Sequence, residues 1–282
     1  MFPMYEMNEI LARDLIERAY REDLGDAGDI TTLATIPADA VVTARLNARA
    51  EGVACGVALA ADCFAFVDRG LDIALFKKDG DRIAPKDCLM EIRGSARSIL
   101  TAERVALNFS GRLSGIATLT ADYVAQVAHT TAKICCTRKT TPGLRALEKF
   151  AVKCGGGMNH RFGLYDAVMI KDNHIAACGG IGAAIDRARE QIGHMVKIEV
   201  EIDRLADLEE ALAHHPDIIM LDNMGNDDLR EGIAIIAGRA KVEASGSVSL
   251  DRVASIAETG VDLISVGRLT HSAPNFDLGL DF

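Results

Sequence analysis

The sequence predicts an α/β protein that consists of an N-terminal α+β unit and a C-terminal run of βα units. Its 282 residues correspond to roughly two domains at about 150 residues each. In the first part, alternating strand patterns are joined by tight turns. After residue 112, short apolar runs recur between helical stretches. The hydrophobic content of 49% and the charged content of 26% are ordinary for a globular protein, so a disordered or fibrous chain is excluded.

The N-terminal part is predicted to be a helix followed by strands and a second helix. The first helix begins at about Asn8, a preferred N-cap residue, and ends near Gly25. The alternation of apolar residues predicts strands over 41–48, 71–76 and 88–92 and a helix near 58–67.

A long helical pattern then leads into the second part of the chain. It extends over 98–127 and is interrupted around Ser114-Gly115. We therefore expect a domain boundary near residue 112, with domains over 1–112 and 113–269.

Six apolar runs after this boundary have the composition of buried strands: Ala132-Cys136, Ala167-Ile170, Val196-Val200, Ile218-Leu221, Val242-Ala244 and Leu263-Val266. Their centres are separated by 34, 30, 21, 24 and 21 residues. This spacing is typical of βα units, which require a parallel sheet covered by helices.

Polar residues or glycine follow each run: Arg138-Lys139, Lys171, Glu201, Asp222, Ser245-Gly246 and Gly267. In a barrel these strand ends converge on one mouth. In an open doubly wound sheet they spread along an edge, and only a switch point makes a crevice. Both architectures fit the spacing, and the uninterrupted series of polar ends favours the barrel.

The net charge of -10, from 31 basic and 41 acidic side chains, excludes a general nucleic-acid or anionic-membrane binder. Residues 133–174 are the exception, with eight basic and three acidic side chains. A positive island of this kind in an acidic protein attracts small anions.

The seven cysteines form no CxxC pair, which predicts reduced thiols in a cytoplasmic protein. Residues 1–9 carry no export signal, and apolar runs of about 18 residues, the length that a membrane span needs, are absent from the sequence.

A triple glycine stands immediately before an Asn-His-Arg sequence at 159–161. Glycines allow close approach of a ligand, and the guanidinium of Arg161 can bind a carboxylate in a bidentate manner. We interpret His160 and Arg161 as two cation-forming side chains that, with Arg138, recognise a carboxylate. Near the last two strand ends, Ser245-Gly246 and Gly267 offer backbone N–H groups for a phosphate.

Two acids, Glu201 and Asp222, end neighbouring strands of the same sheet. Two oxygen ligands suit Mg2+ that is carried in on a polyphosphate better than a permanent metal cage. The histidines and cysteines lack ligand spacing, which argues against zinc. A site that accepts carboxylates, a phosphate and a Mg-bound diphosphate predicts phosphoribosyl transfer.

Three long motifs carry a resemblance to a known family: Thr137-Arg138-Lys139-Thr140-Thr141-Pro142-Gly143-Leu144-Arg145, Gly155-Gly156-Gly157-Met158-Asn159-His160-Arg161-Phe162-Gly163-Leu164 and Lys171-Asp172-Asn173-His174. Shorter matches include Leu100-Thr101-Ala102-Glu103-Arg104, Glu199-Val200-Glu201, Leu221-Asp222-Asn223 and Glu243-Ala244-Ser245-Gly246. From about residue 7 onward the chain resembles the quinolinate phosphoribosyltransferases, also called nicotinate-nucleotide pyrophosphorylases (carboxylating).

The resemblance implies a pentosyltransferase that converts quinolinate and phosphoribosyl pyrophosphate to nicotinate mononucleotide, pyrophosphate and CO2, with Mg2+, in NAD biosynthesis. It implies an N-terminal sandwich domain and an incomplete, seven-stranded α/β barrel. The C-terminal tail, within 270–282, would return to the first domain. It also implies a homodimer with a shared active site, and leaves open whether dimers pair into hexamers.

The resemblance also implies roles for individual residues. Quinolinate would contact Arg138, His160, Arg161 and Lys171, with Arg104 reaching in from the neighbouring subunit. Lys139 and Lys171 would lie between the two substrates, and Glu201 and Asp222 near the ribose and the Mg-diphosphate. The 5'-phosphate would be bound at Ser245, Gly246, Ser247 and Gly267. Ser247 departs from the family pattern, in which many relatives have a second glycine.

Two alternative functions differ in class. A nicotinate phosphoribosyltransferase without decarboxylation would need fewer cations, because its substrate is a monocarboxylate. A non-enzymatic, anion-binding or transport-associated relative would not need the Asn-His-Arg and Lys-Asp-Asn-His clusters, and both are present.

Overall fold

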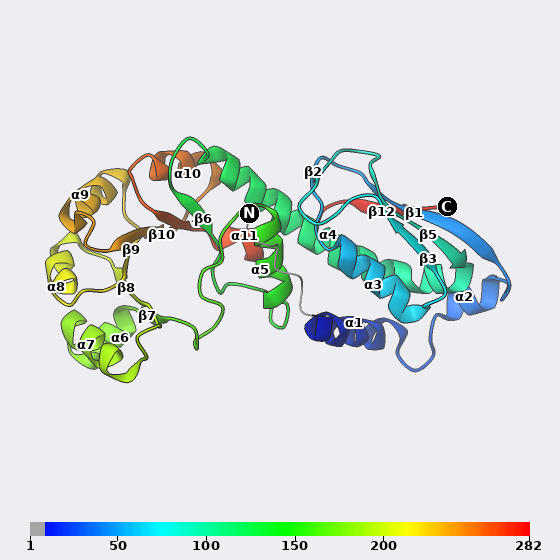
Figure 1. The fold of residues 1–282 in the computed structure, drawn as a ribbon, viewed down its shortest axis with the longest axis horizontal. Helices are drawn as coiled ribbons and strands as arrows, with labels where there is room; N and C mark the ends of the chain where they lie inside the picture. Colours follow the sequence, from blue (N-terminus) through cyan, green and yellow to red (C-terminus); the bar gives the residue numbers. More distant parts are fainter. Residues whose placement is uncertain (1–8) are drawn as a thin grey trace. The chain divides into compact units, whose positions relative to one another are not determined.

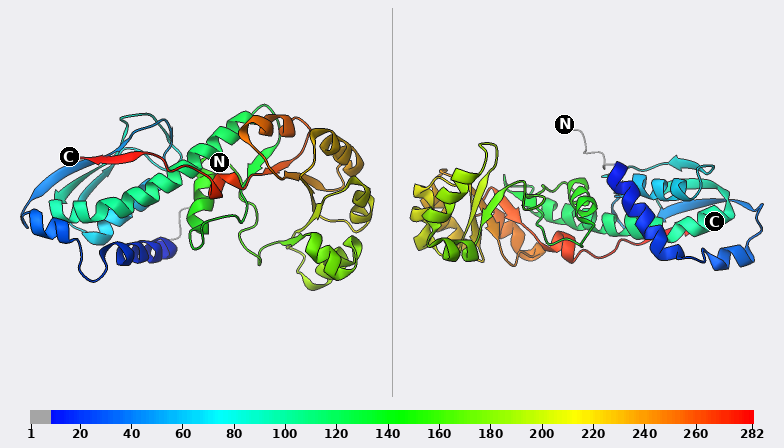
Figure 2. Two further views of the ribbon diagram at one scale, coloured as in Figure 1. Left: turned by 180° about the vertical axis from the view of Figure 1, so that it is seen from behind. Right: turned by 90° about the horizontal axis from the view of Figure 1, so that it is seen from below.

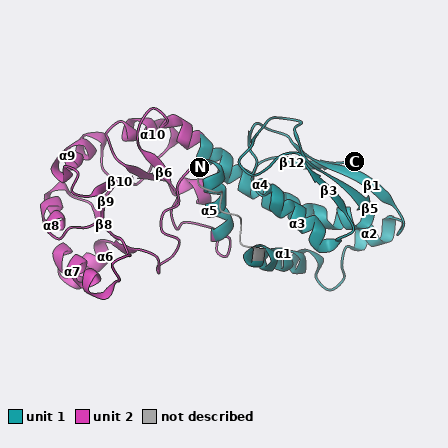
Figure 3. Ribbon diagram, viewed as in Figure 1, with its two compact units in different colours: residues 1–121, 146–156, 273–282 teal, residues 122–145, 157–272 magenta. Residues whose placement is uncertain are grey.

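A computed structural model describes residues 9–282, so the expected N-cap at Asn8 and the expectation for residues 1–8 lie outside the described residues. The described chain forms two units (Figure 3). Unit 1 takes the residues up to 121 together with 146–156 and 273–282, and unit 2 takes 122–145 and 157–272. This division falls later in the chain than the boundary expected near residue 112. Among the described residues, no helix combines the length and apolar character needed to cross a membrane.

Unit 1 is an antiparallel sheet with helices. Its elements are α1 (Glu9–Leu24), α2 (Ile30–Thr35), β1 (Val41–Ala48), β2 (Gly52–Val53), α3 (Val57–Val67), β3 (Asp72–Leu75), β4 (Arg82–Ile83), β5 (Cys88–Ser95), most of α4 (Ala96–Gln126), nearly all of α5 (Arg145–Cys154) and β12 (Leu278–Asp281). The strand order of the main sheet is β12-β1-β5-β3, and β2 pairs with β4. Strand β1 alternates between buried Ala44, Leu46 and Ala48 and more exposed neighbours, as expected for a sheet with one buried face.

The end of the chain forms part of unit 1. Strand β12 pairs antiparallel with β1, with Leu280 opposite Leu46, and the left view of Figure 2 shows the C-terminal strand in red. This pairing covers the edge of β1 that would otherwise expose unpaired backbone groups.

Helix α4 is continuous, so the expected interruption at Ser114-Gly115 is wrong. The small residues serve packing. A Cβ on Gly115 would lie 2.0 Å from the carbonyl oxygen of Pro274, and the Ser114 hydroxyl bonds both the N–H and the C=O of Cys55 at 2.9 and 3.0 Å. The backbones of other segments approach the helix here, which is why large side chains are absent.

Unit 2 alternates strands and helices, as the sequence predicts (Figure 1): β6 (Lys133–Cys135), β7 (Val168–Ile170), α6 (Asp172–Cys178), α7 (Ile181–Gln191), β8 (Ile198–Ile202), the 3-10 turn η1 (Leu205–Asp207), α8 (Leu208–Ala213), β9 (Ile218–Asp222), α9 (Asn226–Ile236), β10 (Lys241–Ser245), α10 (Leu250–Ala257), β11 (Leu263–Ser265) and α11 (Arg268–His271). The strands are parallel, in the order β6-β11-β10-β9-β8-β7. Because β6 and β7 are not paired with each other in this order, the barrel is incomplete, as expected.

Over residues 9–282 the barrel sheet has six strands, one fewer than the resemblance implies. A single residue, Met158, takes the seventh position beside β6. Its N–H donates to Ile134 O at 2.8 Å, and its carbonyl accepts from Cys136 N at 3.0 Å. The preceding glycines, one of which (Gly156) has a φ of 86°, favour a turn over an extended strand and limit the pairing to one bridge.

Candidate active site

The interior of the barrel is lined by pairs of residues that lie two positions apart, on or just after five of its strands. Side chains on a strand alternate between its faces, so such pairs share the inner face. The pairs are Met169 and Lys171, Glu199 and Glu201, Met220 and Asp222, Glu243 and Ser245, and Ser265 and Gly267. The second member of each pair lies nearer the carboxyl end of its strand, where βα barrels carry their active sites.

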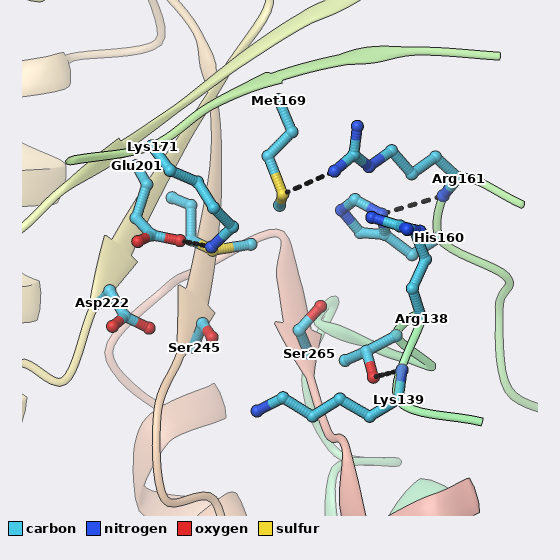
Figure 4. A pocket seen from close by; sticks show the side chains of 12 residues that line it. Arg138, Lys139, His160, Arg161, Met169, Lys171, Glu201, Asp222, Ser245 and Ser265 are labelled. Carbon is cyan, nitrogen blue, oxygen red and sulfur yellow. Dashed lines mark hydrogen bonds and ion pairs between the residues drawn. The ribbon is translucent and has the colours of Figure 1, made fainter. Parts of the chain in front are cut away.

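The first pocket, with a volume of about 360 Å³, opens at these strand ends (Figure 4). It is lined by Thr137, Arg138, Lys139, His160, Arg161, Met169, Lys171, Glu201, Met220, Asp222, Ser245 and Ser265. Eight of the twelve residues that we expected in the site, from Arg138 to Ser245, therefore come together in unit 2 alone.

The second pocket, with a volume of about 470 Å³, adjoins the first. It brings together the expected phosphate residues Gly246, Ser247 and Gly267, and also contains Ser249, Arg268 and His271. Lys139, Asp222 and Ser245 line both pockets. Their position allows one ligand to occupy each pocket with these side chains between them.

Arg104 does not line either pocket. It lies exposed on α4 in unit 1. The implied role for Arg104 at a neighbouring subunit's site stays a prediction.

Two guanidinium groups dominate the charge of the first pocket. Burial and the nearby positive charge of Arg138 lower the pKa of Arg161. The Nε of Arg138 is buried without a hydrogen-bond partner, and a terminal nitrogen of Arg161 donates only to the weak acceptor Met169 Sδ, at 3.5 Å. Both guanidiniums can therefore bind an anion with carboxylate geometry, which would also offset their mutual repulsion.

His160 is held by both of its ring nitrogens. Nδ1 accepts the backbone N–H of Arg161 at 2.8 Å, and Nε2 lies 2.9 Å from Glu199 Oε2 and 3.6 Å from Glu243 Oε1. Because Nδ1 accepts a hydrogen bond, the ring N–H that faces Glu199 is on Nε2. His160 was interpreted as a cation-forming side chain, and the structure adds that its Nε2 faces two carboxylates.

Glu243 lies at the bottom of the barrel interior and is fully buried. Burial and the neighbouring charge of Glu199 raise the pKa of Glu243 from 4.5 to about 7, and the Ser265 hydroxyl donates to its carboxylate. Neither glutamate had a role in the sequence analysis, although both stand in the motifs that carry the resemblance. The two-residue period that relates them to Glu201 and Ser245 is the signal that identifies them.

Replacement of Glu243 by glutamine is expected to change how stability depends on pH. Between about pH 4.5 and pH 7 the folded protein holds a proton on Glu243 that the unfolded chain releases, so wild-type stability falls as the pH rises. The Glu243→Gln variant lacks this loss, which is worth about 3 kcal/mol. Urea denaturation at about pH 5 and about pH 8 measures it. The free energy of unfolding of the variant should rise relative to that of the wild type only at the higher pH. An equal difference at both pH values would contradict the prediction.

An acidic cluster lies at the mouth of the barrel. Carboxylate oxygens of Glu201, Asp203 and Asp222 lie within 4.8 Å of one another. Lys171 Nζ forms an ion pair with Glu201, so the expected cation and the expected acid neutralise each other in the ligand-free site. Three oxygen donors fit a hard divalent cation. Asp203 was missed by the sequence analysis, although it stands two residues after Glu201, just past the end of β8.

The turn after β10 has the shape of a phosphate-binding loop. Gly246 has a φ of 96°, and a Cβ at this position would lie 2.2 Å from Asn223 Oδ1 and 2.7 Å from Asn223 N. Ser247 adopts a φ of 49°, the left-handed conformation that glycine would take more easily. The serine that departs from the family pattern therefore keeps a glycine-like turn and adds a hydroxyl.

Comparisons with known proteins show the family of the chain. The family models of the quinolinate phosphoribosyl transferase N-terminal and C-terminal domains match residues 29–114 and 116–281. The chain is 45% identical over 275 residues to a probable nicotinate-nucleotide pyrophosphorylase [carboxylating] of Bacillus subtilis, covering 98% of this chain and 94% of that one. It is also 45% identical over 276 residues to the nicotinate-nucleotide pyrophosphorylase [carboxylating] of Mycobacterium leprae, covering 96% of each.

Among solved structures, NadC from Streptococcus pyogenes superposes with a TM-score of 0.95, at 41% identity and with 98% of each chain covered. Both domains, their order and nearly the full length are therefore shared with these relatives. The chain belongs to the quinolinate phosphoribosyltransferase family.

Proposed function

We propose that this protein transfers the phosphoribosyl group of phosphoribosyl pyrophosphate to quinolinate and releases CO2, giving nicotinate mononucleotide and pyrophosphate for NAD biosynthesis. The observation that carries the proposal is the pair of adjoining pockets with Lys139 and Asp222 between them. The first pocket supplies two guanidiniums for a pyridine dicarboxylate. The second supplies the turn at Gly246 for the 5'-phosphate of the donor.

Bond formation in this proposal depends on how the chain positions two reactants. The pyridine nitrogen forms a bond to ribose C1 while the bond from C1 to the diphosphate oxygen breaks. Holding both reactants in line lowers the activation free energy by on the order of 7 to 11 kcal/mol. Arg138 and Arg161 orient the ring, and Lys139 faces the junction between the two pockets.

Charge that develops in this step is met by residues of the strand ends. The carboxylates of Glu201 and Asp222 offset the positive charge that grows on the ribose. The cluster of Glu201, Asp203 and Asp222 fits a divalent cation, and Mg2+ carried by the diphosphate would neutralise the leaving group there.

Decarboxylation follows from the charge of the product ring. Once its nitrogen is bonded to the ribose, the ring is cationic and accepts the electron pair of the bond to the neighbouring carboxylate. CO2 leaves, and a proton takes its place on the ring carbon. The guanidinium pair favours a dicarboxylate over nicotinate, which has a single carboxylate to place between Arg138 and Arg161.

An assay with matched substrates tests the function. The protein is incubated with Mg2+, phosphoribosyl pyrophosphate and either quinolinate or nicotinate, and both mononucleotide and CO2 are followed. We expect both products with quinolinate only. Mononucleotide from nicotinate without CO2 would favour the sister reaction, and no product with either acid would favour an anion-binding protein.

We further propose a homodimer in which Arg104 of one subunit completes the first pocket of the other. The support is the exposure of Arg104 on α4 and its absence from the pockets of its own chain. Hexamers would be formed by pairing such dimers. Within residues 9–282 the cysteines form no disulfide bonds, which supports a cytoplasmic location for the enzyme.

Mixing two inactive variants tests the shared site. Arg104→Ala and Lys139→Ala remove groups from different subunits of the same site. Mixed dimers should therefore contain one site with both groups intact and recover part of the wild-type activity. Native mass spectrometry measures subunit exchange in the same sample, and complete exchange without activity would contradict the shared site.

A further inference from the structure

Glu199 and Glu243 lie beneath the first pocket and do not line it. Glu199 is on β8 and Glu243 on β10, with exposed fractions of 3% and 0%. Met220 is the inner residue of β9, the strand between them, and has no acceptor oxygen in its side chain. Both carboxylates reach the same atom, Nε2 of His160, which is 2.9 Å from Glu199 and 3.6 Å from Glu243.

The segment that carries His160 has little secondary structure to hold it. It follows the glycines and the single bridge at Met158, and residues 159–167 form neither helix nor strand. Further hydrogen bonds hold it, including one from the Arg145 side chain to the carbonyl oxygen of Phe162 at 3.1 Å. Cys136 Sγ donates to Asn159 Oδ1 at 3.3 Å, and Asp166 accepts the N–H groups of Phe162 and Gly163. The His160 side chain is the contact of this segment with the glutamates of the barrel interior.

His160 transmits this contact directly to Arg161. Its Nε2–H donates to Glu199, and its Nδ1 accepts the backbone N–H of Arg161. The ring thus connects the glutamates of the barrel interior to the backbone of Arg161. From this backbone the Arg161 guanidinium extends into the pocket (Figure 4).

The negative charge of Glu199 also stabilises the charged form of Arg161. Burial and Arg138 both disfavour the charged form of Arg161, and Glu199 favours it. One oxygen of each glutamate remains buried without a partner, an arrangement that costs stability relative to an apolar pair. This cost is consistent with selection for a property other than stability.

We propose that Glu199 and Glu243 are positioning residues that hold the ring of His160 and thereby set Arg161 where the first pocket takes a carboxylate. The inference rests on the proposed function for the identity of the ligand, a pyridine dicarboxylate. It assigns the two glutamates no contact with that ligand. Their effect is therefore specific to the affinity for the dicarboxylate and small for the phosphoribosyl donor.

Matched substitutions at Glu199 test the proposal. Glu199→Gln keeps an oxygen that accepts the His160 Nε2–H, whereas Glu199→Leu has a similar size and removes the acceptor. We expect the Leu variant to raise KM for quinolinate at least tenfold, with KM for phosphoribosyl pyrophosphate and kcat within about twofold of the wild type. The Gln variant should restore most of the loss. Equal effects on both substrates, or a Gln variant as impaired as Leu, would overturn the proposal.

Substitutions of His160 and Glu243, the other residues of this contact, test the same proposal. The amide nitrogen of Gln in His160→Gln can reach Glu199, whereas that of the shorter Asn in His160→Asn cannot, so Gln should be the milder change. Glu243→Gln should likewise be milder than Glu243→Leu. Val200→Ala, on the same strand as Glu199 but facing the other way, controls for a general loss of stability and should leave both KM values unchanged.

Hydrogen exchange in the ligand-free protein separates this inference from the proposed function. The peptide containing 159–165 should exchange at least fivefold faster in Glu199→Leu than in the wild type and in Glu199→Gln, because the Arg161 N–H loses its supported acceptor. Unchanged exchange would refute the positioning role whatever the protein binds. If the wild type fails to bind quinolinate in calorimetry while exchange changes as expected, the proposed function fails and the positioning contact stands.

Discussion

Alanine in place of Arg138 or Arg161 is expected to remove measurable quinolinate binding. Each guanidinium lies in a partly buried pocket, and its loss leaves a substrate carboxylate desolvated without its partner. Truncating one partner of a buried charge pair costs about 2 to 5 kcal/mol, or roughly 30- to 5,000-fold in dissociation constant. Calorimetry with quinolinate measures the loss, and binding of phosphoribosyl pyrophosphate should persist in both variants.

A cation at the opposite end of the same strand provides the control. Lys133 is exposed at the start of β6 and is absent from both pockets. Lys133→Ala changes the net charge by the same amount and should bind quinolinate as the wild type does. Normal quinolinate affinity in both arginine variants would show that the first pocket is not the dicarboxylate site.

Alanine in place of Gly246 is expected to abolish productive binding of phosphoribosyl pyrophosphate. Its φ of 96° is strained for any residue with a Cβ, and the added atom would lie 2.7 Å from the backbone nitrogen of Asn223. The left-handed conformation alone costs about 1 to 2 kcal/mol, and the clash with backbone forces the turn to move. We expect kcat/KM for the donor to fall roughly 100-fold or more, which corresponds to about 2.7 kcal/mol.

A glycine in open space is the matched control for this prediction. A Cβ on Gly193 would meet no atom within 4 Å, and its φ is not positive. Gly193→Ala should therefore leave both KM values unchanged. If Gly246→Ala kept its affinity for the donor while the protein stayed folded, the turn after β10 would not be the phosphate site.

Elements whose patterns are local could be predicted from the sequence with small errors. Strand β1 has the expected bounds, 41–48, and β9 extends one residue beyond its expected run. In these strands the alternating apolar residues and the polar residue at the strand end lie within one short stretch of sequence. The interruption expected in α4 was wrong because small residues there reflect contact with Cys55 and Pro274, which are distant in the chain.

The residues of the mouth could also be predicted, because each one follows its own apolar run. Asp203, Glu199 and Glu243 were missed for a different reason. An acid inside or just after a strand is informative only when its neighbours on other strands are known. The charge of His160 likewise depends on what its two nitrogens contact.

The sequence by itself determined the fold class, the series of βα units, the cationic window over 133–174 and the residues at the strand ends. Each of these follows from residue type and spacing along the chain. Only the tertiary structure decided that Lys139 and Asp222 lie between two pockets, that Lys171 pairs with Glu201, and that Glu199 and Glu243 converge on His160. The reason is physical, since these relations depend on distances between strands that only the closure of the sheet brings together.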